Sequence, residues 1–232
     1  MELIWEGLQQ ALGMLLGLDN EVMGVTWLSL AVSGSAVLLS LLIGVPLGVF
    51  LALNRFPGRR IVVSLVNTGM GLPPVVVGLF VTIMLWRNGP FGVLRILYTP
   101  TAMVIAQCII ASPIVAGLTI AAIQQLNPKL RLQILALGAS RWQMVLLLLR
   151  EARLPLLAAV MAGFGGVISE IGASMMVGGN IEGQTRVLTT ATVMETSKGN
   201  FGAAIALSVL LMLLVYAVNL TLTLIQQRGR PY

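Results

Sequence analysis

The side chains that could do chemistry in this chain are few, and most of them interrupt long apolar segments. Glu170 lies well inside one of these segments, just before Gly172 and Ala173. A carboxylate at the centre of a membrane costs roughly 2.5–3.5 kcal/mol on insertion scales, so it normally faces a cavity or a partner. Two interpretations stay open. Glu170 is either a structural residue that bonds neighbouring hydroxyls and backbone amides, or a residue at a gate between two copies of the chain.

Composition excludes several kinds of catalytic site. The sequence has no histidine, which rules out a His-based metal site and a Ser-His-Asp triad. Its one cysteine, Cys108, lies in an apolar run and is interpreted as a small hydrophobic residue. The segment GNIEGQT at 179–185 lacks the Gly-Lys-Ser/Thr ending of a phosphate loop. We therefore expect no enzyme active site, no metal ligand and no cofactor bound by this chain itself.

Hydroxyls, glycines and prolines are more frequent in the apolar segments than a plain membrane anchor needs. Residues 26–48 contain three glycines, a proline and several serines, and residues 67–74 read NTGMGLPP. Small residues four apart let helices approach closely. Proline and glycine at membrane depth are tolerated where protein or a water-filled cavity covers the freed backbone groups. Each residue alone could serve helix packing, but together they favour a pathway through the membrane.

The elements that carry these residues are predicted to be membrane-spanning helices. The chain has 232 residues, of which 57% are hydrophobic and 9% charged, whereas a soluble domain carries about 25% charged residues. Long apolar runs in lipid become helices because every backbone polar group must be bonded within the element. We therefore predict an all-α integral membrane protein with about five core spans, over residues 22–53, 62–86, 101–123, 154–177 and 201–225. Residues 1–20 are interpreted as an N-terminal interfacial helix, and residues 21–232 as a single transmembrane domain.

The distribution of Lys and Arg predicts the orientation. Of the 14 basic residues, ten fall on one side of the predicted membrane and four on the other. The ten are Arg55, Arg59, Arg60, Lys129, Arg131, Arg141, Arg150, Arg153, Arg228 and Arg230. The basic side is the cytoplasmic side. With five spans, the N-terminus then lies outside and the C-terminus inside. The net charge of +6 is thus explained by topology rather than by nucleic-acid binding.

The polar stretch 124–155 is predicted to form a cytoplasmic helical hairpin. Asn127-Pro128 is a helix-start signal, and Gly138 allows a sharp turn between two short helices. Apolar residues recur along the stretch, at Leu130, Ile134, Leu137 and Trp142, and predict one apolar stripe. Two interpretations stay open: a partner protein covers this stripe, or the hairpin lies on the bilayer surface.

A resemblance to a known family favours the first of these. LALGASRW at 135–142, followed by LPLL at 154–157, resembles the signature loop of ABC importer permeases. In that family the loop forms the coupling helices that dock into a cleft on the ATPase subunit. This sequence lacks the family's usual acidic start at 132–134. Its spacing from Gly138 to Pro155 is also longer than usual, by about one helical turn.

Further segments resemble one part of this family, the permeases for oxyanions. ISEIGASMMVGGNIEGQTRVLTT at 168–190 is similar to a block in permeases for molybdate and sulfate. RFPGRR at 55–60, MGLPPVVVGL at 70–79 and TPTAMVIAQ at 99–107 look like the tungstate branch of the same family. The matches occur in the expected order and cover the whole chain.

The resemblance implies an assembly and a set of site residues. The chain would act as a homodimer in the cytoplasmic membrane of a bacterium or archaeon, with two ATPase subunits inside and an oxyanion-binding protein outside. ATP and Mg would be bound by the ATPase, and the 128–153 region would couple its motion to the gate. The ATPase-coupling residues are Leu137, Gly138, Ala139, Ser140, Arg141 and Trp142. The pathway or gate candidates are Asn67, Thr68, Ser169, Glu170, Thr185 and Thr189. Most of these are hydroxyls and amides, which can donate hydrogen bonds to an oxyanion without holding it tightly.

Three alternatives to a tungstate importer remain. A molybdate or sulfate permease would share the same family features, because selectivity is expected to reside in the binding protein. A passive channel or a proton-coupled carrier would need no docking hairpin and would favour buried charge pairs, which the sequence does not suggest. A membrane enzyme is disfavoured by the absence of histidine and of clustered carboxylates.

Overall fold

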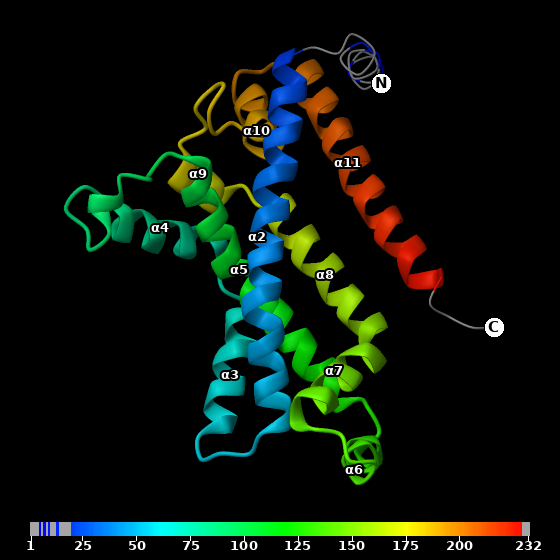
Figure 1. Ribbon diagram of the computed structural model, residues 1–232. Coiled ribbons are helices and arrows are strands. Elements are labelled where there is room, and N and C mark those ends of the chain that lie inside the picture. Colours follow the sequence, from blue (N-terminus) through cyan, green and yellow to red (C-terminus); the bar gives the residue numbers. More distant parts are fainter. Residues whose placement is uncertain (1–4, 6, 8, 10–12, 14–19, 229–232) are drawn as a thin grey trace.

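The structure is a computed structural model that describes residues 5, 7, 9, 13 and 20–228 (Figure 1). Across this part of the chain the regular elements are all helices, as predicted. The predicted interfacial helix over residues 1–20 falls almost wholly outside the described residues.

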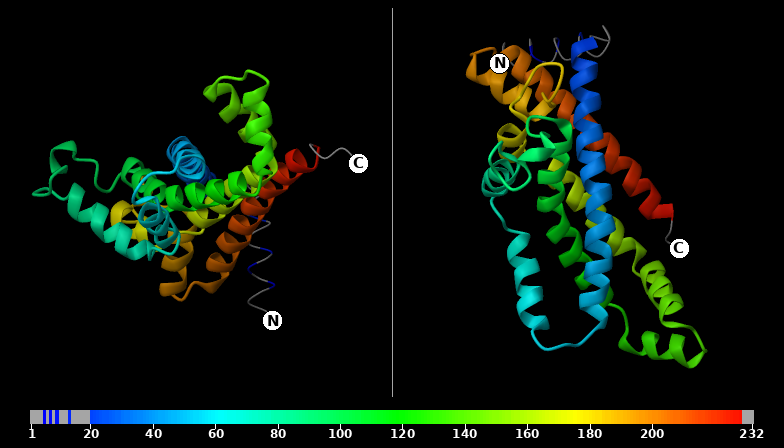
Figure 2. Two further views of the ribbon diagram at one scale, coloured as in Figure 1. Left: turned by 90° about the horizontal axis from the view of Figure 1, so that it is seen from below. Right: turned by 60° about the vertical axis from the view of Figure 1, so that its left-hand side comes forward.

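Three helices are each long and apolar enough to cross a membrane: α2 (Asn20–Leu53), α5 (Pro100–Gln124) and α11 (Phe201–Arg228). By length and composition they agree with the predicted spans over 22–53, 101–123 and 201–225. α5 begins with proline at its first position, where a helix needs no N–H from that residue. α2 and α5 pack together along much of their length, and α11 starts at the same end of the molecule as α2 and leans away from it (Figures 1 and 2).

The predicted span over 62–86 is not one helix. It is divided into α3 (Arg59–Gly69) and α4 (Pro74–Leu85), which meet at an angle of 100°. Pro73 is extended, with ψ 121°, and Pro74 begins α4. A proline disfavours helical backbone in the residue before it, so the Pro73-Pro74 pair ends any helix that arrives from α3. α3 runs beside α2, and α4 projects sideways from the bundle (Figure 1).

The predicted span over 154–177 is also broken. α8 (Arg153–Ile168) and α9 (Gly172–Gly178) are bent by 58° at residues 169–171. The described chain therefore contains three unbroken candidate spans, or five if each bent pair counts as one.

Close contact between α2 and α5 explains two of the glycines. A Cβ atom on Gly44 would lie 2.9 Å from the carbonyl oxygen of Ser112, and one on Gly48 would lie 2.6 Å from Cβ of Thr119. These glycines are four residues apart, on one face of α2. They allow the two backbones to approach, so here the packing interpretation of the small residues is correct.

The remaining elements lie at the two ends of the bundle. α6 (Pro128–Ala136) and α7 (Arg141–Glu151) form a hairpin at the end where α2 finishes and α3 begins (Figures 1 and 2). α10 (Leu188–Ser197) lies at the opposite end, near the start of α2. A short 3-10 helix, η1 (Gly92–Leu94), lies in the connection from α4 to α5.

Candidate functional site

The two helix breaks meet in the bundle, although about one hundred residues separate them in the sequence. A Cβ on Gly172, the first residue of α9, would lie 2.6 Å from Cγ2 of Val75 near the start of α4. A Cβ on Gly78 would lie 2.7 Å from Cα of Ala173. α4 and α9 thus approach each other closely, with Gly78 against the backbone of Ala173 and Gly172 against the side chain of Val75.

The α3–α4 break rests on the middle of α5. A Cβ on Gly69 would lie 2.8 Å from the ring of Pro113, and one on Gly117 would lie 2.5 Å from the sulfur of Met70. Pro113 lies inside α5, where it removes one helical hydrogen bond. Irregular backbone from three separate segments therefore lies close together in the bundle, and at membrane depth such backbone is stable only where protein or a water-filled cavity covers it.

Glu170 caps α9. Its Oε1 accepts a hydrogen bond from the backbone N–H of Ala173 at 2.9 Å. This N–H is one of the first four in the helix, which have no partner within the helix. A negative charge is also favoured at that end by the helix dipole. The backbone carbonyl of Glu170 accepts a second bond, from Oγ1 of Thr189 at 3.2 Å. The structure thus brings Glu170 and Thr189 together.

The donor to the Glu170 carboxylate is a backbone amide and not a neighbouring hydroxyl. Ser169 Oγ donates to the carbonyl of Gly165 at 2.7 Å, one turn back in α8. Ser174 Oγ instead accepts a bond from Nε2 of Gln107 at 3.1 Å. Of the two kinds of compensating donor expected from the sequence, the backbone amide is the one that bonds the carboxylate.

Asn67 and Thr68 are exposed at the end of α3, immediately before the break. Neither side chain is bonded to another residue in the described part of the chain. Both are therefore free to donate to a ligand. Ser169 is likewise exposed, at the other break.

Thr185 and Thr189 are enclosed by the protein. Thr185 is fully buried, and its Oγ1 donates to the carbonyl of Gly178 at 2.6 Å and accepts from the N–H of Ile181 at 2.9 Å. It thereby closes the loop between α9 and α10. Thr189 is 5% exposed and reaches the α8–α9 break through Glu170. These two threonines hold the broken helix in place.

The hairpin has the capping residues that its sequence predicts. Asn127 Oδ1 accepts a hydrogen bond from the N–H of Lys129 at 2.9 Å and starts α6. Ser140 and Gln143 form a reciprocal capping box at the start of α7. Between the two helices Gly138 has φ 84°, a left-handed conformation that glycine adopts without strain. The predicted helix start and turn are confirmed.

The apolar residues of the hairpin divide into an inner and an outer set. Ile134, Met144 and Leu148 are buried against the ends of α2 and α5. Leu137 and Trp142 point outwards, with 88% and 69% of their surface exposed. The prediction of one shared stripe is wrong, because the turn at Gly138 separates its members. The exposed apolar surface of the hairpin is therefore limited to its tip, at Leu137 and Trp142.

Two arginines connect the hairpin end of the molecule to α2. The sequence indicated only their positive charge. Arg59 Nε donates to the carbonyl of Leu51 at 2.6 Å. A guanidinium N–H of Arg131, on α6, donates to the carbonyl of Leu53 at 2.9 Å. The last carbonyls of a helix lack partners within it, and cations are favoured there. The polar pair Gln107–Ser174 was also missed, although a glutamine inside an apolar run was a visible signal.

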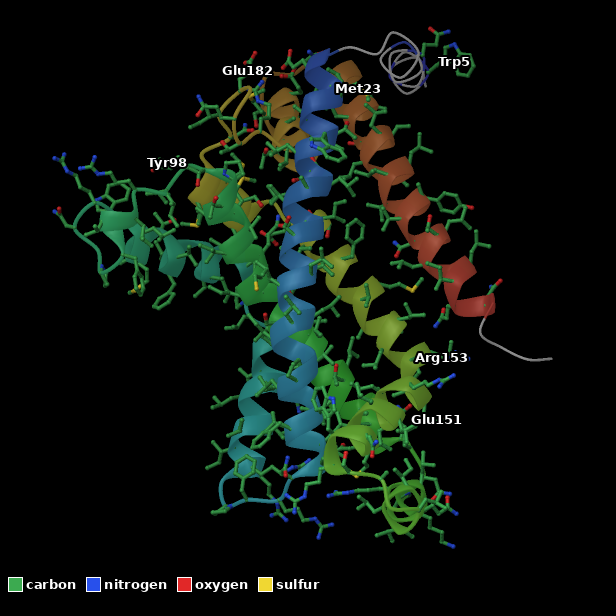
Figure 3. The ribbon with its side chains drawn as sticks, in the orientation of Figure 1. Trp5, Met23, Tyr98, Glu151, Arg153 and Glu182 are labelled. Carbon is green, nitrogen blue, oxygen red and sulfur yellow. The ribbon has the colours of Figure 1, made fainter. Side chains whose placement is uncertain are left out.

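Ion pairs secure the opposite end. Arg186 lies 3.5 Å from Glu21 and 3.1 Å from Glu182, which connects the first turn of α2 to the loop after α9. Glu182 is seen near the start of α2, while Glu151 and Arg153 lie towards the hairpin (Figure 3).

A hydrogen bond from Lys198 at 2.8 Å lowers the pKa of the Glu195 carboxyl, against the opposing effect of partial burial. No group of three or more potential metal-ligating side chains occurs among the described residues.

The family model and the most similar relatives all describe membrane subunits of transport systems. Residues 44–231 match the family described as binding-protein-dependent transport system inner membrane component. The tungstate uptake system permease protein TupB of Peptoclostridium acidaminophilum is 37% identical over 98% of this chain and 100% of its own length. TupB of Campylobacter jejuni is 36% identical over 94% of this chain and 92% of its own. The molybdenum transport system permease protein ModB of Escherichia coli K12 is 29% identical over 76% of this chain and 82% of its own.

A solved structure has the same fold. The permease chain in an inward-facing structure of the MetNI methionine ABC transporter superimposes with a TM-score of 0.75. The alignment covers 94% of this chain and 98% of that one, at 23% sequence identity. At this identity the similarity concerns the fold.

Proposed function

This chain belongs to the family of binding-protein-dependent transport system inner membrane components, the permease subunits of ABC importers, and we propose that its cargo is tungstate. The observation that carries the proposal is the near full-length similarity to two tungstate permeases, at 37% and 36% identity. The two matches cover 100% and 92% of these relatives' own length.

Molybdate is the second candidate substrate. Molybdate and tungstate are tetrahedral oxyanions of the same charge and nearly the same size. The molybdenum permease ModB is 29% identical over a smaller share of the chain, 76%. A pathway lined by neutral donors would pass either anion, so the binding protein would select between them.

We propose that the anion passes where the α3–α4 and α8–α9 breaks meet, between two copies of the chain. Asn67, Thr68 and Ser169 are exposed polar side chains beside irregular backbone. In lipid, such backbone is stable only when protein or a water-filled cavity covers it. A second copy would supply that cover. Glu170 would serve as a structural residue of the gate, since its carboxylate is already bonded to α9, and Thr185 and Thr189 would hold the gate's frame.

The hairpin tip is proposed as the docking surface for the ATPase. It comprises the six residues Leu137, Gly138, Ala139, Ser140, Arg141 and Trp142. Leu137 and Trp142 are too exposed to stabilise this chain alone, so a partner cleft that covers them would gain apolar contact. The inner residues of the hairpin pack on α2 and α5, which offers a mechanical route from the ATPase to the breaks. The ATPase would bind ATP and Mg.

The proposed orientation has the hairpin in the cytoplasm and the start of α2 outside. It is supported by the positive-inside rule, since Arg55, Arg59 and Arg60 lie at the same end of the bundle as the hairpin. α2 and α11 run from the opposite end towards this one, which would leave the C-terminus inside.

The substrate proposal is tested by deleting the gene and measuring cellular tungsten, molybdenum and sulfur by mass spectrometry. Cells should lose tungsten accumulation from nanomolar tungstate and regain it when the gene is restored. A deletion that lowers molybdenum or sulfur but leaves tungsten unchanged would contradict the proposal. A comparison strain restores the Gly138→Val form, which should enter the membrane but recover less uptake than the unaltered gene.

A further inference from the structure

Two adjoining cavities lie at the end of the bundle where α2 passes into α3. One has a volume of 630 Å³, and its lining includes Arg55, Arg59 and Arg131 together with Leu132. The other has a volume of 560 Å³, and its lining includes Arg55, Arg59 and Arg60. Arg55 and Arg59 therefore line both cavities, and the two adjoining cavities, together called the hollow, are lined by four arginines.

The positive charge of this hollow is not compensated within the described chain. Glu151 is the one acidic residue between positions 22 and 169, and it lines neither cavity. The salt bridges of the described residues involve none of the four arginines. Arginine keeps its charge at every physiological pH. The hollow is therefore a strongly electropositive site with no acidic residue among those that line it.

Two of the arginines are held in place with donors to spare. Arg59 and Arg131 each use one N–H to cap the end of α2, at the carbonyls of Leu51 and Leu53. A guanidinium has five N–H donors, so most remain for a ligand. Capping alone accounts for these two residues. It does not account for Arg55 and Arg60, which are exposed and make no bond to another described side chain.

The surface beyond the arginines is apolar. Ile61 and Leu65 follow Arg60 on α3, one turn apart on the same face, and are 67% and 65% exposed. The combination of a basic hollow and an apolar helix face suits an amphiphile whose anionic head and hydrocarbon tail lie side by side. A soluble anion would leave the apolar face at Ile61 and Leu65 uncovered. Acidic side chains of a docked protein would likewise pair with the arginines without covering that face.

We propose that this hollow binds the phosphodiester headgroup of an anionic phospholipid from the cytoplasmic leaflet, with an acyl chain along Ile61 and Leu65. Arginine forms paired hydrogen bonds with phosphate oxygens, and basic pockets between helices on the cytoplasmic side recognise such headgroups. The proposal goes beyond the proposed function and rests on it only for the orientation in the membrane. A bound lipid would connect α2, α3 and, through Arg131, the hairpin.

The test is lipid binding to the full chain assembled with its ATPase in a neutral detergent. Phosphatidylglycerol, phosphatidylcholine and inorganic phosphate are titrated separately, and bound lipid is counted by native mass spectrometry. The test variant is Arg55→Gln/Arg60→Gln. The matched control is Arg87→Gln/Arg95→Gln, which removes two arginines from the α4–α5 connection. Neither variant touches the proposed pathway or the hairpin tip.

Wild type and control should retain phosphatidylglycerol in preference to phosphatidylcholine. The test variant should bind phosphatidylglycerol about 30-fold more weakly, because each of its two lost arginines contributes about fivefold to binding an anionic lipid. Equal retention of both lipids by wild type would overturn the proposal. So would full binding of phosphatidylglycerol by the test variant, or binding of inorganic phosphate as tight as that of phosphatidylglycerol, which would mark a site for soluble anions. Loss of the ATPase from the test variant would instead mark the hollow as a protein-docking surface and would overturn the lipid assignment. Tungstate uptake is measured separately, so the lipid-binding result can be interpreted even if the transport proposal fails.

Discussion

At the scale of single residues, Glu170 shows how a carboxylate is accommodated beside a helix break. The sequence predicted that backbone amides or nearby hydroxyls would compensate it, and the amide of Ala173 does so. The identity of that amide could not be predicted, because it depends on α9 starting at Gly172. No proline occurs between 156 and 230 to mark that start. The break is fixed by contacts with α4 that are distant in sequence.

Replacing Glu170 separates its structural role from a role in proton transfer. Glu170→Gln keeps an oxygen that can accept from Ala173, so ATP-driven uptake should be largely retained. Glu170→Leu leaves that N–H without a partner, at a cost of about 1 kcal/mol for a lost cap and more where water cannot replace it. We expect a lower melting temperature and little uptake for the leucine form. A glutamine form that is inactive while fully folded would contradict this assignment.

At the scale of elements, the sequence predicted the long spans and the hairpin but not the course of the broken helices. α2, α5 and α11 follow directly from apolar length. The hairpin follows from Asn127, Ser140 and Gly138, whose capping and turn chemistry is local. The signals for the α3–α4 break were present in Gly71 and the two prolines at 73–74, yet the 100° angle comes from packing against α5 and α9. The site residues are therefore predictable as polar positions, but their grouping is not.

The turn of the hairpin is tested at Gly138, where φ is 84°. A β-branched residue in this left-handed conformation costs roughly 1–2 kcal/mol, although a Cβ there would meet open space. Gly138→Val should therefore weaken capture of the ATPase about tenfold, while the permease still reaches the membrane. Gly138→Asn is the matched control, because asparagine tolerates this conformation, and it should retain docking. Normal assembly and uptake in the valine form would refute a role for the turn.

The α2–α5 contact is tested at Gly48. A side chain there collides with Thr119 and with the carbonyl of Ala116, at 2.6 and 2.7 Å. Gly48→Val should destabilise the purified protein by about 1–3 kcal/mol, as overpacking does, and should lower its melting temperature. Gly34→Val lies on the same helix, where a Cβ has no neighbour within 4 Å. It should be close to neutral, and equal effects of the two variants would argue against close packing of these helices.

At the scale of the whole molecule, the orientation can be tested with introduced cysteines in a Cys108→Ser background. Ser197→Cys at the end of α10 and Pro57→Cys in the α2–α3 loop are both exposed and lie at opposite ends of the bundle. Pro57 is preferable to Gly58, whose φ of 84° disfavours a side chain. In intact cells, an impermeant thiol reagent should label only the cysteine at 197. Labelling at 57 alone would reverse the topology and remove the hairpin from the cytoplasm.

The central claim concerns the transport activity of the assembled molecule. The chain, its ATPase and the oxyanion-binding protein are reconstituted in proteoliposomes, and tungstate uptake is measured with ATP, with a non-hydrolysable ATP analogue, and with ATP plus a protonophore. The account predicts uptake with ATP alone, unchanged by the protonophore, and far stronger for tungstate than for sulfate at equal concentration. Uptake that follows a pH gradient in the absence of ATP hydrolysis, or that favours sulfate, would contradict it.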